Sequence, residues 1–392
     1  FGVGSFYLVS FNLIKGQWVR ENMKVAIFSS DIDETNGYGN ITNGLCGEFV
    51  KAGLDFELFV PQTVKARCVG KNFKINPILP GVSKKNFFGF FKKITLKNFN
   101  LAHSLFDFHH CFMAARSAKS NHLPFIMGSQ GTYGVLPLTE WPEKYFLKWA
   151  YRRAREIIVP SEFTKEKIIE YAGESRPYNI SVIHNGVNFE RFNAAKDISN
   201  LRAKYQDNKI LLTVGGLKPR KGQDLVIRAL PEVLKKHPEV KYLVIGDGPW
   251  KKHLIDLATS LNVKNYVEFA GVLKDDELVK YFQLCDIYAH TPRVVNLNFE
   301  GFGIVYLEAS ASGKPIVASD AGGIRDAVIH GKTGLIAPDG DVAKIAEYIN
   351  NLLDNPDYAR ELGRNGIEYA RSNDWSVIAG QFIEKYKKYA IL

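Results

Sequence analysis

The stretch of residues 300–341 constrains the fold of this 392-residue chain more than any other feature. Two glutamates, Glu300 and Glu308, lie eight residues apart, and glycines separate the first from the helix formers of residues 304–311. Gly313 follows where a helix cap is expected, and the run PIVAS after it is typical of a buried parallel strand. This order predicts that Glu300 lies in a loop, that the glycines form the first turn of a helix, and that Glu308 lies about two turns further along. Such a first turn, with unpaired N–H groups and little side chain, suits a phosphate.

The same pattern also fits a strand–helix–strand unit with two incidental glutamates. The length of the ordered match favours a function instead. EGFGIVYLEA and the continuation GKPIVASDAGGIRDAVIHGKTGLIAPDGD resemble the Glu-x7-Glu signature of the family 4 retaining glycosyltransferases, which have the GT-B fold. The resemblance covers about residues 23–390. It implies two Rossmann-like α/β domains facing a cleft, with a nucleotide-sugar donor mainly on the C-terminal domain and the acceptor on the N-terminal one.

The domain organisation follows from this resemblance and from local patterns. We expect an N-terminal domain over residues 23–190 and a C-terminal domain over residues 191–374, with a linker at about 188–205. By resemblance, a helix that begins at Trp375 returns to the N-terminal domain. We therefore assign residues 375–392 to that domain. Residues 1–22 precede the first strand, and we expect them to be an extension outside the fold rather than a surface anchor.

The first strand–turn–helix unit begins at residue 24. A strand over residues 24–30, a turn containing Gly37 and Gly39, a helix over residues 41–52 and a strand over residues 55–60 predict the start of a Rossmann-like sheet. The turn lacks a complete G-x-G-x-x-G, which argues against a dinucleotide cofactor. The resemblance implies that this glycine turn approaches the donor phosphates.

Two positions depart from the family pattern. The family usually carries a His-Gly pair at a strand edge, with the histidine touching the donor hexose, but the alignment places Gln130 there. Glutamine keeps its hydrogen-bonding capacity and cannot take a proton. In the loop GGLKPRKGQD, Lys221 matches a family lysine that binds the diphosphate, whereas the partner arginine falls on Gly216. We expect Lys218 or Arg220 to substitute, because a flexible cation can reach a phosphate from a neighbouring position.

The resemblance assigns roles to further residues. Glu308 is suited to accept hydrogen bonds from ribose hydroxyls and Glu300 from hexose hydroxyls. Together with Lys221 and Gln130, Glu300 is expected to be catalytic, without a metal or a resident cofactor. The residues expected to bind the donor are Gly37, Gly39, Lys218, Arg220, Lys221, Gly248, Val272, Glu300, Gly301, Phe302, Gly303, Ile304 and Glu308.

Donor and acceptor are less constrained. EGFGIVYLEA and PRKGQD most resemble the phosphatidylinositol mannosyltransferase branch, which uses GDP-mannose. Relatives that differ in few residues use UDP-glucose, UDP-galactose or UDP-N-acetylglucosamine, and the acceptor is expected to be a glycan or a lipid-linked molecule. Two other classes stay open. A sugar-nucleotide epimerase would lack the placed glutamate pair, and a catalytically silent binding protein is compatible with the changes at Gly216 and Gln130.

Composition agrees with a soluble two-domain protein. Hydrophobic residues make up 46% and charged residues 23%. The four cysteines have no metal-binding spacing, which predicts a reducing, cytoplasmic setting. No apolar run reaches the roughly 18 residues needed to cross a bilayer. The net charge of +10 suits phosphate-bearing substrates, an anionic membrane surface or nucleic acid, but no known nucleic-acid-binding module accompanies it.

Residues 84–99 (KKNFFGFFKKITLKNF) interleave lysines with phenylalanines. One interpretation is a helix with a core face and a solvated face. The alternative is a basic, aromatic surface at the inner face of the membrane, where Lys84, Lys85, Lys92 and Lys93 meet anionic lipid.

Overall fold

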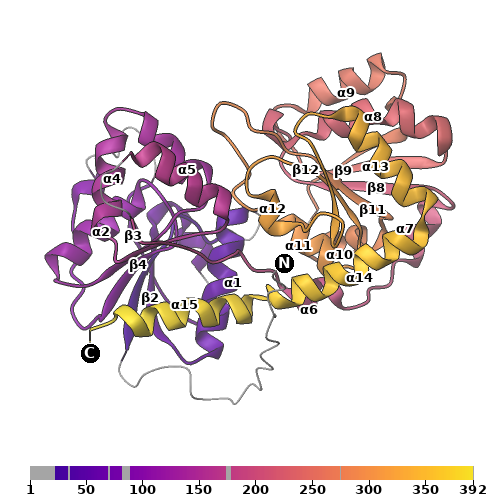
Figure 1. The fold of residues 1–392 in the computed structure, drawn as a ribbon. Coiled ribbons are helices and arrows are strands. Elements are labelled where there is room, and N and C mark those ends of the chain that lie inside the picture. The colour runs from indigo at the N-terminus through magenta and orange to yellow at the C-terminus, as the bar shows by residue number, and fades with distance from the viewer. Residues whose placement is uncertain are drawn as a thin grey trace, which may run out of the picture.

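The computed structural model in Figure 1 has two α/β domains side by side, joined by a C-terminal helix that reaches from one to the other. It describes residues 23–33, 36–68, 71–81, 89–173, 178–273 and 275–391. The expectation for residues 1–22 lies outside the described residues.

The N-terminal domain is built on a seven-stranded parallel sheet with strand order β3-β2-β1-β4-β5-β6-β7. The strands are short and mostly buried, as expected for a sheet covered by helices on both faces. They are β1 (Lys24–Phe28), β2 (Asp55–Pro61), β3 (Lys74–Leu79), β4 (Leu101–Ser104), β5 (Phe125–Gly128), β6 (Glu156–Val159) and β7 (Ile180–Val182). The helices are α1 (Gly37–Lys51), α2 (His110–Ser120), α3 (Thr132–Val135), α4 (Glu143–Arg153) and α5 (Glu162–Ala172), with short 3₁₀ turns at Gln62–Cys68 and Leu136–Thr139.

The C-terminal domain repeats this plan with a six-stranded parallel sheet of order β10-β9-β8-β11-β12-β13. Its strands are β8 (Lys209–Val214), β9 (Val240–Ile245), β10 (Val267–Gly271), β11 (Ile287–His290), β12 (Ile316–Ser319) and β13 (Gly334–Ala337). The helices are α6 (Phe189–Asn193), α7 (Ser199–Tyr205), α8 (Gln223–Lys236), α9 (Lys251–Ser260), α10 (Asp275–Leu284), α11 (Ile304–Ala311), α12 (Ile324–Ala327), α13 (Val342–Asp354) and α14 (Pro356–Ser372), with 3₁₀ turns at Pro219–Lys221 and Lys264–Tyr266.

Each sheet separates two apolar layers because alternate side chains of a strand point to opposite faces. In β1, Val25 and Ile27 belong to one core layer, and Ala26 and Phe28 belong to the other. The expected α/β architecture with two Rossmann-like sheets is confirmed. In such open parallel sheets, ligands bind beyond the carboxyl ends of the strands, which locates the candidate site.

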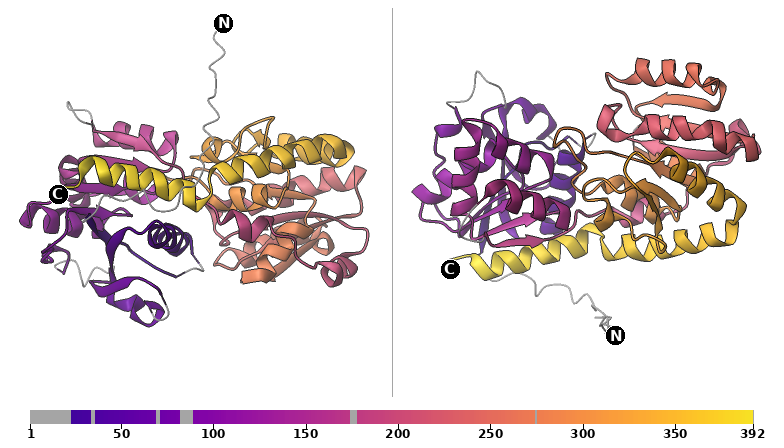
Figure 2. Two further views of the ribbon diagram at one scale, coloured as in Figure 1. Left: turned by 90° about the horizontal axis from the view of Figure 1, so that it is seen from below. Right: turned by 45° about the horizontal axis from the view of Figure 1, so that its top comes forward.

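Helix α15 (Trp375–Tyr389) runs back along the N-terminal domain, as expected (Figures 1 and 2). It packs on α1, and its Tyr386 donates or accepts a hydrogen bond with His103 Nδ1 at 2.8 Å. The Trp375 indole fills the space left by two glycines: a Cβ atom at Gly44 or at Gly186 would overlap it. Because Gly186 lies in the crossing between the two sheets, this contact ties the crossing to the N-terminal domain.

Some element boundaries differ from the prediction by one or two residues, and the start of the first helix differs by four. The first helix begins at Gly37 rather than at residue 41, because the Asn36 side chain accepts a hydrogen bond from the Gly39 N–H and caps it. The two glycines therefore lie within the first turn of α1 and not in a separate turn before it. Gly39 is needed there, since a Cβ atom would overlap the Asp33 backbone.

Candidate active site

Three loops of the C-terminal domain meet at the carboxyl end of its sheet. Strand β8 leads into residues 215–222, β11 leads through residues 291–303 into α11, and β12 leads into Gly322 and Gly323. Close backbone packing holds the loops together. The Gly323 N–H donates a hydrogen bond to the Glu300 carbonyl at 2.8 Å, and a Cβ atom at Gly322 would overlap that same carbonyl.

Glu300 forms the charged centre of this site. Its Oε2 atom accepts hydrogen bonds from Lys221 Nζ at 2.5 Å and from Arg220 Nη1 at 2.9 Å, and its side chain is 15% exposed. Burial alone would raise the pKa of Glu300, but the charges of Lys221 and Arg220 outweigh burial and lower the pKa to about 2. The carboxylate is therefore ionised at neutral pH and is held by two cations from the neighbouring loop.

His290, which no sequence pattern marked as a site residue, lies at the end of β11 behind this cluster. It is fully buried, and among the described residues neither ring nitrogen has a hydrogen-bond partner. Burial, helped by the charges of Lys221 and Arg220 and opposed by that of Glu300, lowers the pKa of His290 to about 3. The imidazole is therefore neutral, so it does not add a third positive charge to the cluster.

Glu308 lies on α11, within the same domain but in a different electrostatic environment. Only 8% of the residue is exposed, and no hydrogen bond or ion pair of its carboxylate appears among the described residues. Burial raises the pKa of Glu308 to about 7, and the charge of Arg191 opposes this shift. The two glutamates, which are equivalent in a sequence pattern, thus differ in charge state near neutral pH.

The amino end of α11 has the form expected for an anion site. Its cap residue, Gly303, has φ of 91° and provides no side-chain cap, so the N–H groups of the first turn lack a side-chain partner from that position. The Phe302 side chain, by contrast, is 1% exposed and belongs to the domain core. Phe302 can therefore face a donor only through its backbone.

The N-terminal domain brings Gln130 to the same place. The Gln130 N–H donates to Asp107 Oδ2 at 2.9 Å, and its side-chain Oε1 accepts a hydrogen bond from Asn185 at 3.1 Å. The next residue, Gly131, packs against Gly301, because a Cβ atom at Gly131 would lie only 2.7 Å from the Gly301 Cα. The structure thus places the loop of Gln130 directly beside the loop of Glu300.

The first turn of α1 approaches the cation loop from the N-terminal domain. Tyr38 lies between Gly37 and Gly39, and its ring packs edge-on against Phe106 at 4.5 Å. Burial raises the pKa of Tyr38 well above its usual value, Asp107 adds to this shift, and the charge of Arg220 opposes it. The charge of Arg220 therefore reaches the first turn of α1 in the opposite domain.

Other expected donor-binding residues are more exposed. Lys218 is exposed beside Arg220, and Val272 is 60% exposed after β10. Gly248 packs on the Leu217 backbone, where a Cβ atom would lie 2.5 Å from the carbonyl oxygen. Gly216, where the family arginine is absent, has open space: the nearest atom to an added Cβ, the Asp247 carbonyl oxygen, lies 3.8 Å away.

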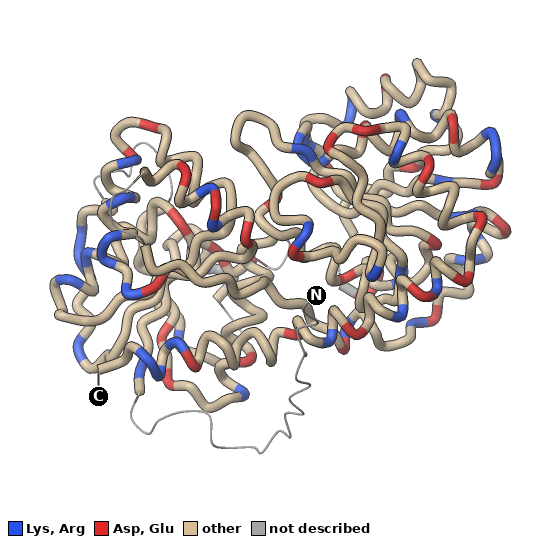
Figure 3. The backbone as a smooth tube through the Cα atoms, in the orientation of Figure 1, with Lys and Arg blue, Asp and Glu red and all other residues tan. Residues whose placement is uncertain are grey.

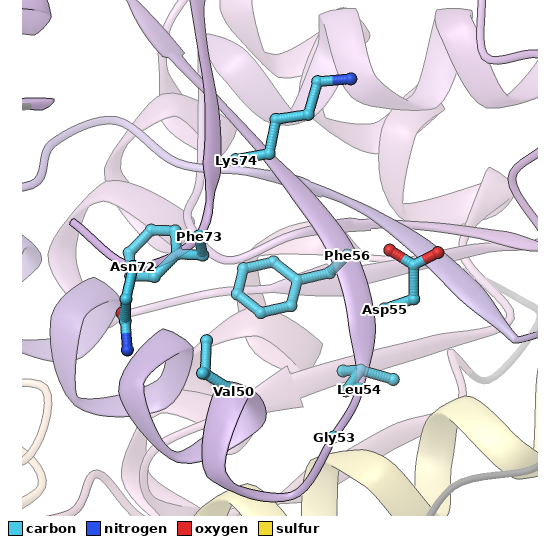
Figure 4. Close-up of a pocket in the computed structure, with 8 residues that line it drawn as sticks. All are labelled: Val50, Gly53, Leu54, Asp55, Phe56, Asn72, Phe73 and Lys74. Atoms are coloured by element: carbon cyan, nitrogen blue, oxygen red, sulfur yellow. The ribbon is translucent and has the colours of Figure 1, made fainter.

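A shallow hollow of about 370 Å³ lies elsewhere, at the amino ends of β2 and β3 (Figure 4). It is lined by Val50, Gly53, Leu54, Asp55, Phe56, Asn72, Phe73 and Lys74. The Lys74 ammonium is already paired with Glu57 at 2.8 Å, and the rings of Phe56 and Phe73 contact each other at 5.4 Å. Because it lies at the opposite end of the strands from Gln130, we do not assign this hollow to the candidate site.

The lysine–phenylalanine segment is described only from residue 89 onward. Phe90 is 2% exposed, and Phe91 packs against Phe112 and Phe146 with ring centroids 5.4 Å apart in both cases. The Phe90 ring is therefore buried in the protein and does not form an aromatic membrane face, and residues 92–96 do not form the alternative helix either. Lys92 and Lys93 are exposed, whereas Lys84 and Lys85 lie outside the described residues.

Basic and acidic residues are interspersed over both domains (Figure 3). Within the described part of the chain, no group of three or more His, Cys, Asp or Glu residues suits a metal ion. No described helix is both long enough and apolar enough to cross a bilayer.

Comparison with known proteins identifies the family. Residues 35–191 match the family model "Glycosyltransferase Family 4", and residues 195–369 match "Glycosyl transferases group 1". Among curated proteins, the chain is 34% identical over 218 residues to a GDP-mannose-dependent alpha-(1-6)-phosphatidylinositol monomannoside mannosyltransferase of Mycolicibacterium smegmatis. That alignment covers 54% of this chain and 56% of the relative, so the chain spans only a little over half of that protein's length. A glycogen synthase of Mycobacterium tuberculosis is 32% identical, with 61% of this chain and 55% of the relative covered.

Solved structures share the fold at lower identity. A protein of Anabaena, HepE, crystallised with UDP and glucose, superposes with a TM-score of 0.74 at 20% identity and covers 93% of this chain and 99% of that one. Sucrose-phosphate synthase of Thermosynechococcus elongatus gives a TM-score of 0.73 at 20% identity, with 93% and 98% covered. The two adjoining family matches and the shared architecture show that the chain belongs to the family 4, group 1 glycosyltransferases and has the GT-B fold.

Proposed function

We propose that this protein is a retaining glycosyltransferase that moves a hexose from a nucleotide diphosphate sugar to a glycan or lipid-linked acceptor. The observation that carries the proposal is the cluster of Glu300, Lys221 and Arg220 beside the open amino end of α11. For the donor we propose GDP-mannose, which is supported by the mannosyltransferase relative of Mycolicibacterium smegmatis. UDP-glucose, UDP-galactose and UDP-N-acetylglucosamine are the alternatives.

The proposed donor site uses the cations and the helix end together. The diphosphate binds between Lys221, Arg220 and the N–H groups at the start of α11, which stabilise the charge that develops on the leaving group. Because this chain provides positive charge from side chains and backbone, the proposed reaction requires no metal. Glu308 accepts hydrogen bonds from the ribose, and Gln130 provides a neutral hydrogen bond to the hexose from the opposite domain.

Glu300 has two roles in this scheme. Without donor it offsets part of the positive charge of Lys221 and Arg220, whose Nζ and Nη1 atoms both contact its Oε2 atom. A diphosphate carries more negative charge than one carboxylate, so it competes for the same cations and frees Glu300 to accept hydrogen bonds from hexose hydroxyls. The backbone of residue 300, fixed by Gly322 and Gly323, keeps the freed carboxylate at the site.

Retention of configuration requires no protein nucleophile in this proposal. The acceptor hydroxyl approaches the anomeric carbon on the face from which the diphosphate departs. The bond from that carbon to the phosphate oxygen breaks as the bond to the acceptor oxygen forms, and the released phosphate oxygen takes the acceptor proton. The task of the protein is to hold both partners in this geometry and to stabilise the leaving group.

The proposed function is tested by incubating the protein with each of the four nucleotide sugars and analysing products by NMR. We expect turnover of GDP-mannose, by hydrolysis or by transfer to a simple α-mannoside, with an α-linked product. Turnover of a UDP sugar instead of GDP-mannose would change the proposed donor and leave the rest of the proposed function intact. Epimerised nucleotide sugar would indicate an epimerase, and binding without turnover would indicate a silent binding protein; either result contradicts transfer.

Lys221 should carry a large share of diphosphate binding because Gly216 replaces the family arginine. We expect Lys221→Ala to lower kcat/KM by a factor that corresponds to about 3 kcal/mol of transition-state stabilisation, if the loss of Lys221 resembles removal of one oxyanion donor. Gly216→Arg in that background should restore part of the activity, since Gly216 lacks a positive φ and an added side chain meets open space. The assay is donor turnover in the parent, both single variants and the double variant. Unchanged activity in Lys221→Ala would show that this loop does not hold the diphosphate.

Glu308 should make nucleotide binding depend on pH. Its pKa of about 7 means that the carboxyl is protonated below pH 7 and ionised above it, and the ionised form is the better acceptor for ribose hydroxyls. We therefore expect the affinity for GDP to fall as the pH is lowered from 8 to 6, by up to about tenfold per unit. Calorimetry on the parent and on Glu308→Gln provides the matched comparison, because the nucleotide phosphate titrates equally in both. Parallel pH profiles would exclude a role for Glu308 in binding the nucleotide.

A further inference from the structure

The loops that carry Gln130 and Glu300 come from different domains, yet a single hydroxyl joins them. Thr132 Oγ1 donates a hydrogen bond to the Phe299 carbonyl at 2.9 Å and accepts one from the Phe299 N–H at 2.9 Å. A threonine hydroxyl has one donor and two acceptor positions, so it can make both bonds at once. Thr132 is 8% exposed, which leaves these backbone groups little access to water as an alternative partner.

Two glycines allow the loops to approach this closely. Gly131 has φ of 97°, a conformation that favours glycine, and an added Cβ atom would lie 2.7 Å from the Gly301 Cα. On the other side, a Cβ atom at Gly301 would lie 2.8 Å from the Gln130 carbonyl oxygen. The backbone contact therefore places Gln130 and Glu300 next to each other without using their side chains.

The phenylalanines on either side of Glu300 are anchored in different domains. The Phe299 ring is 3% exposed, lies in a core layer of the N-terminal domain and packs edge-on against Phe163 at 5.0 Å. The Phe302 ring lies in a core layer of the C-terminal domain. Glu300 thus occupies a short segment fixed at both ends, and its position depends on how the two domains sit against each other.

We propose that Thr132 is a positioning residue for sugar transfer: its hydroxyl fixes the segment before Glu300 against the loop of Gln130, so that groups from both domains meet one hexose. This inference rests on the proposed function. Thr132 does not touch the donor itself and acts through Phe299. Its loss should therefore slow turnover and leave nucleotide affinity unchanged, because the proposed diphosphate and ribose contacts lie within the C-terminal domain.

The experiment compares Thr132→Val, Thr132→Ser and a matched control, Thr139→Val. Valine keeps the shape of threonine and removes the hydroxyl, whereas serine keeps the hydroxyl. Thr139 lies in the same domain, but its hydroxyl donates only to Leu136 in its own turn, at 2.8 Å. The measurements are kcat for GDP-mannose and UDP-glucose turnover, the Kd for GDP and UDP, and amide hydrogen exchange of the peptide that contains Phe299.

We expect Thr132→Val to lower kcat about tenfold and to speed amide exchange at Phe299 by a similar factor. This magnitude corresponds to losing the net stabilisation of about one hydrogen bond. The nucleotide Kd should stay within twofold, and Thr132→Ser and Thr139→Val should behave like the parent. Parent-like kcat in Thr132→Val, or equal losses in the valine and serine variants, would overturn the proposal. If the parent turns over none of the four nucleotide sugars, the proposed function fails, while exchange at Phe299 still decides whether Thr132 holds the two loops together.

Discussion

The ion pairs of Glu300 with Lys221 and Arg220 are the interaction on which the rest of the site depends. The contacts at 2.5 and 2.9 Å lower the pKa of Glu300 to about 2 despite its burial. Removing either partner of such a pair leaves a poorly solvated charge, which is costly, so the cluster needs a replacement anion before Glu300 can move. In the proposed function, the donor diphosphate provides that replacement. The unliganded cluster thus keeps an excess positive charge, and in the proposed function donor binding is an exchange of one anion for another.

The fold supports this exchange by fixing the backbones of the site through contacts that do not use the Glu300 or Gln130 side chain. Gly322 and Gly323 pack on the backbone at residue 300, while Gly301 and Gly131 bring the two domains into contact. Phe299 and Phe302 anchor the segment in opposite cores. Helix α15 joins the same domains at a second place, where Trp375 covers Gly44 and Gly186. The site is therefore formed by the relative position of two rigid sheets as much as by its own residues.

Much of this arrangement could be predicted from the sequence because its periodicities are local. The strand and helix pattern predicted both sheets, and the glutamate spacing placed Glu300 in a loop and Glu308 on a helix. The capping by Asn36, which starts α1 four residues early, depends on a side-chain bond that the pattern did not reveal. The bond between Thr132 and Phe299 spans 167 residues, and no local pattern encodes such a contact. The contrast between Glu300 and Glu308 was also hidden, since their pKa values depend on burial and on neighbours brought by the fold.

The central claim is that the donor diphosphate takes the place of Glu300 on Lys221 and Arg220. A crystal structure of the protein with GDP tests it most directly, because the position of one carboxylate decides the outcome. The account predicts diphosphate density between Lys221 and the first turn of α11, with the Glu300 carboxylate no longer in contact with the Lys221 ammonium. Diphosphate bound elsewhere, with Glu300 still paired to both cations, would contradict it.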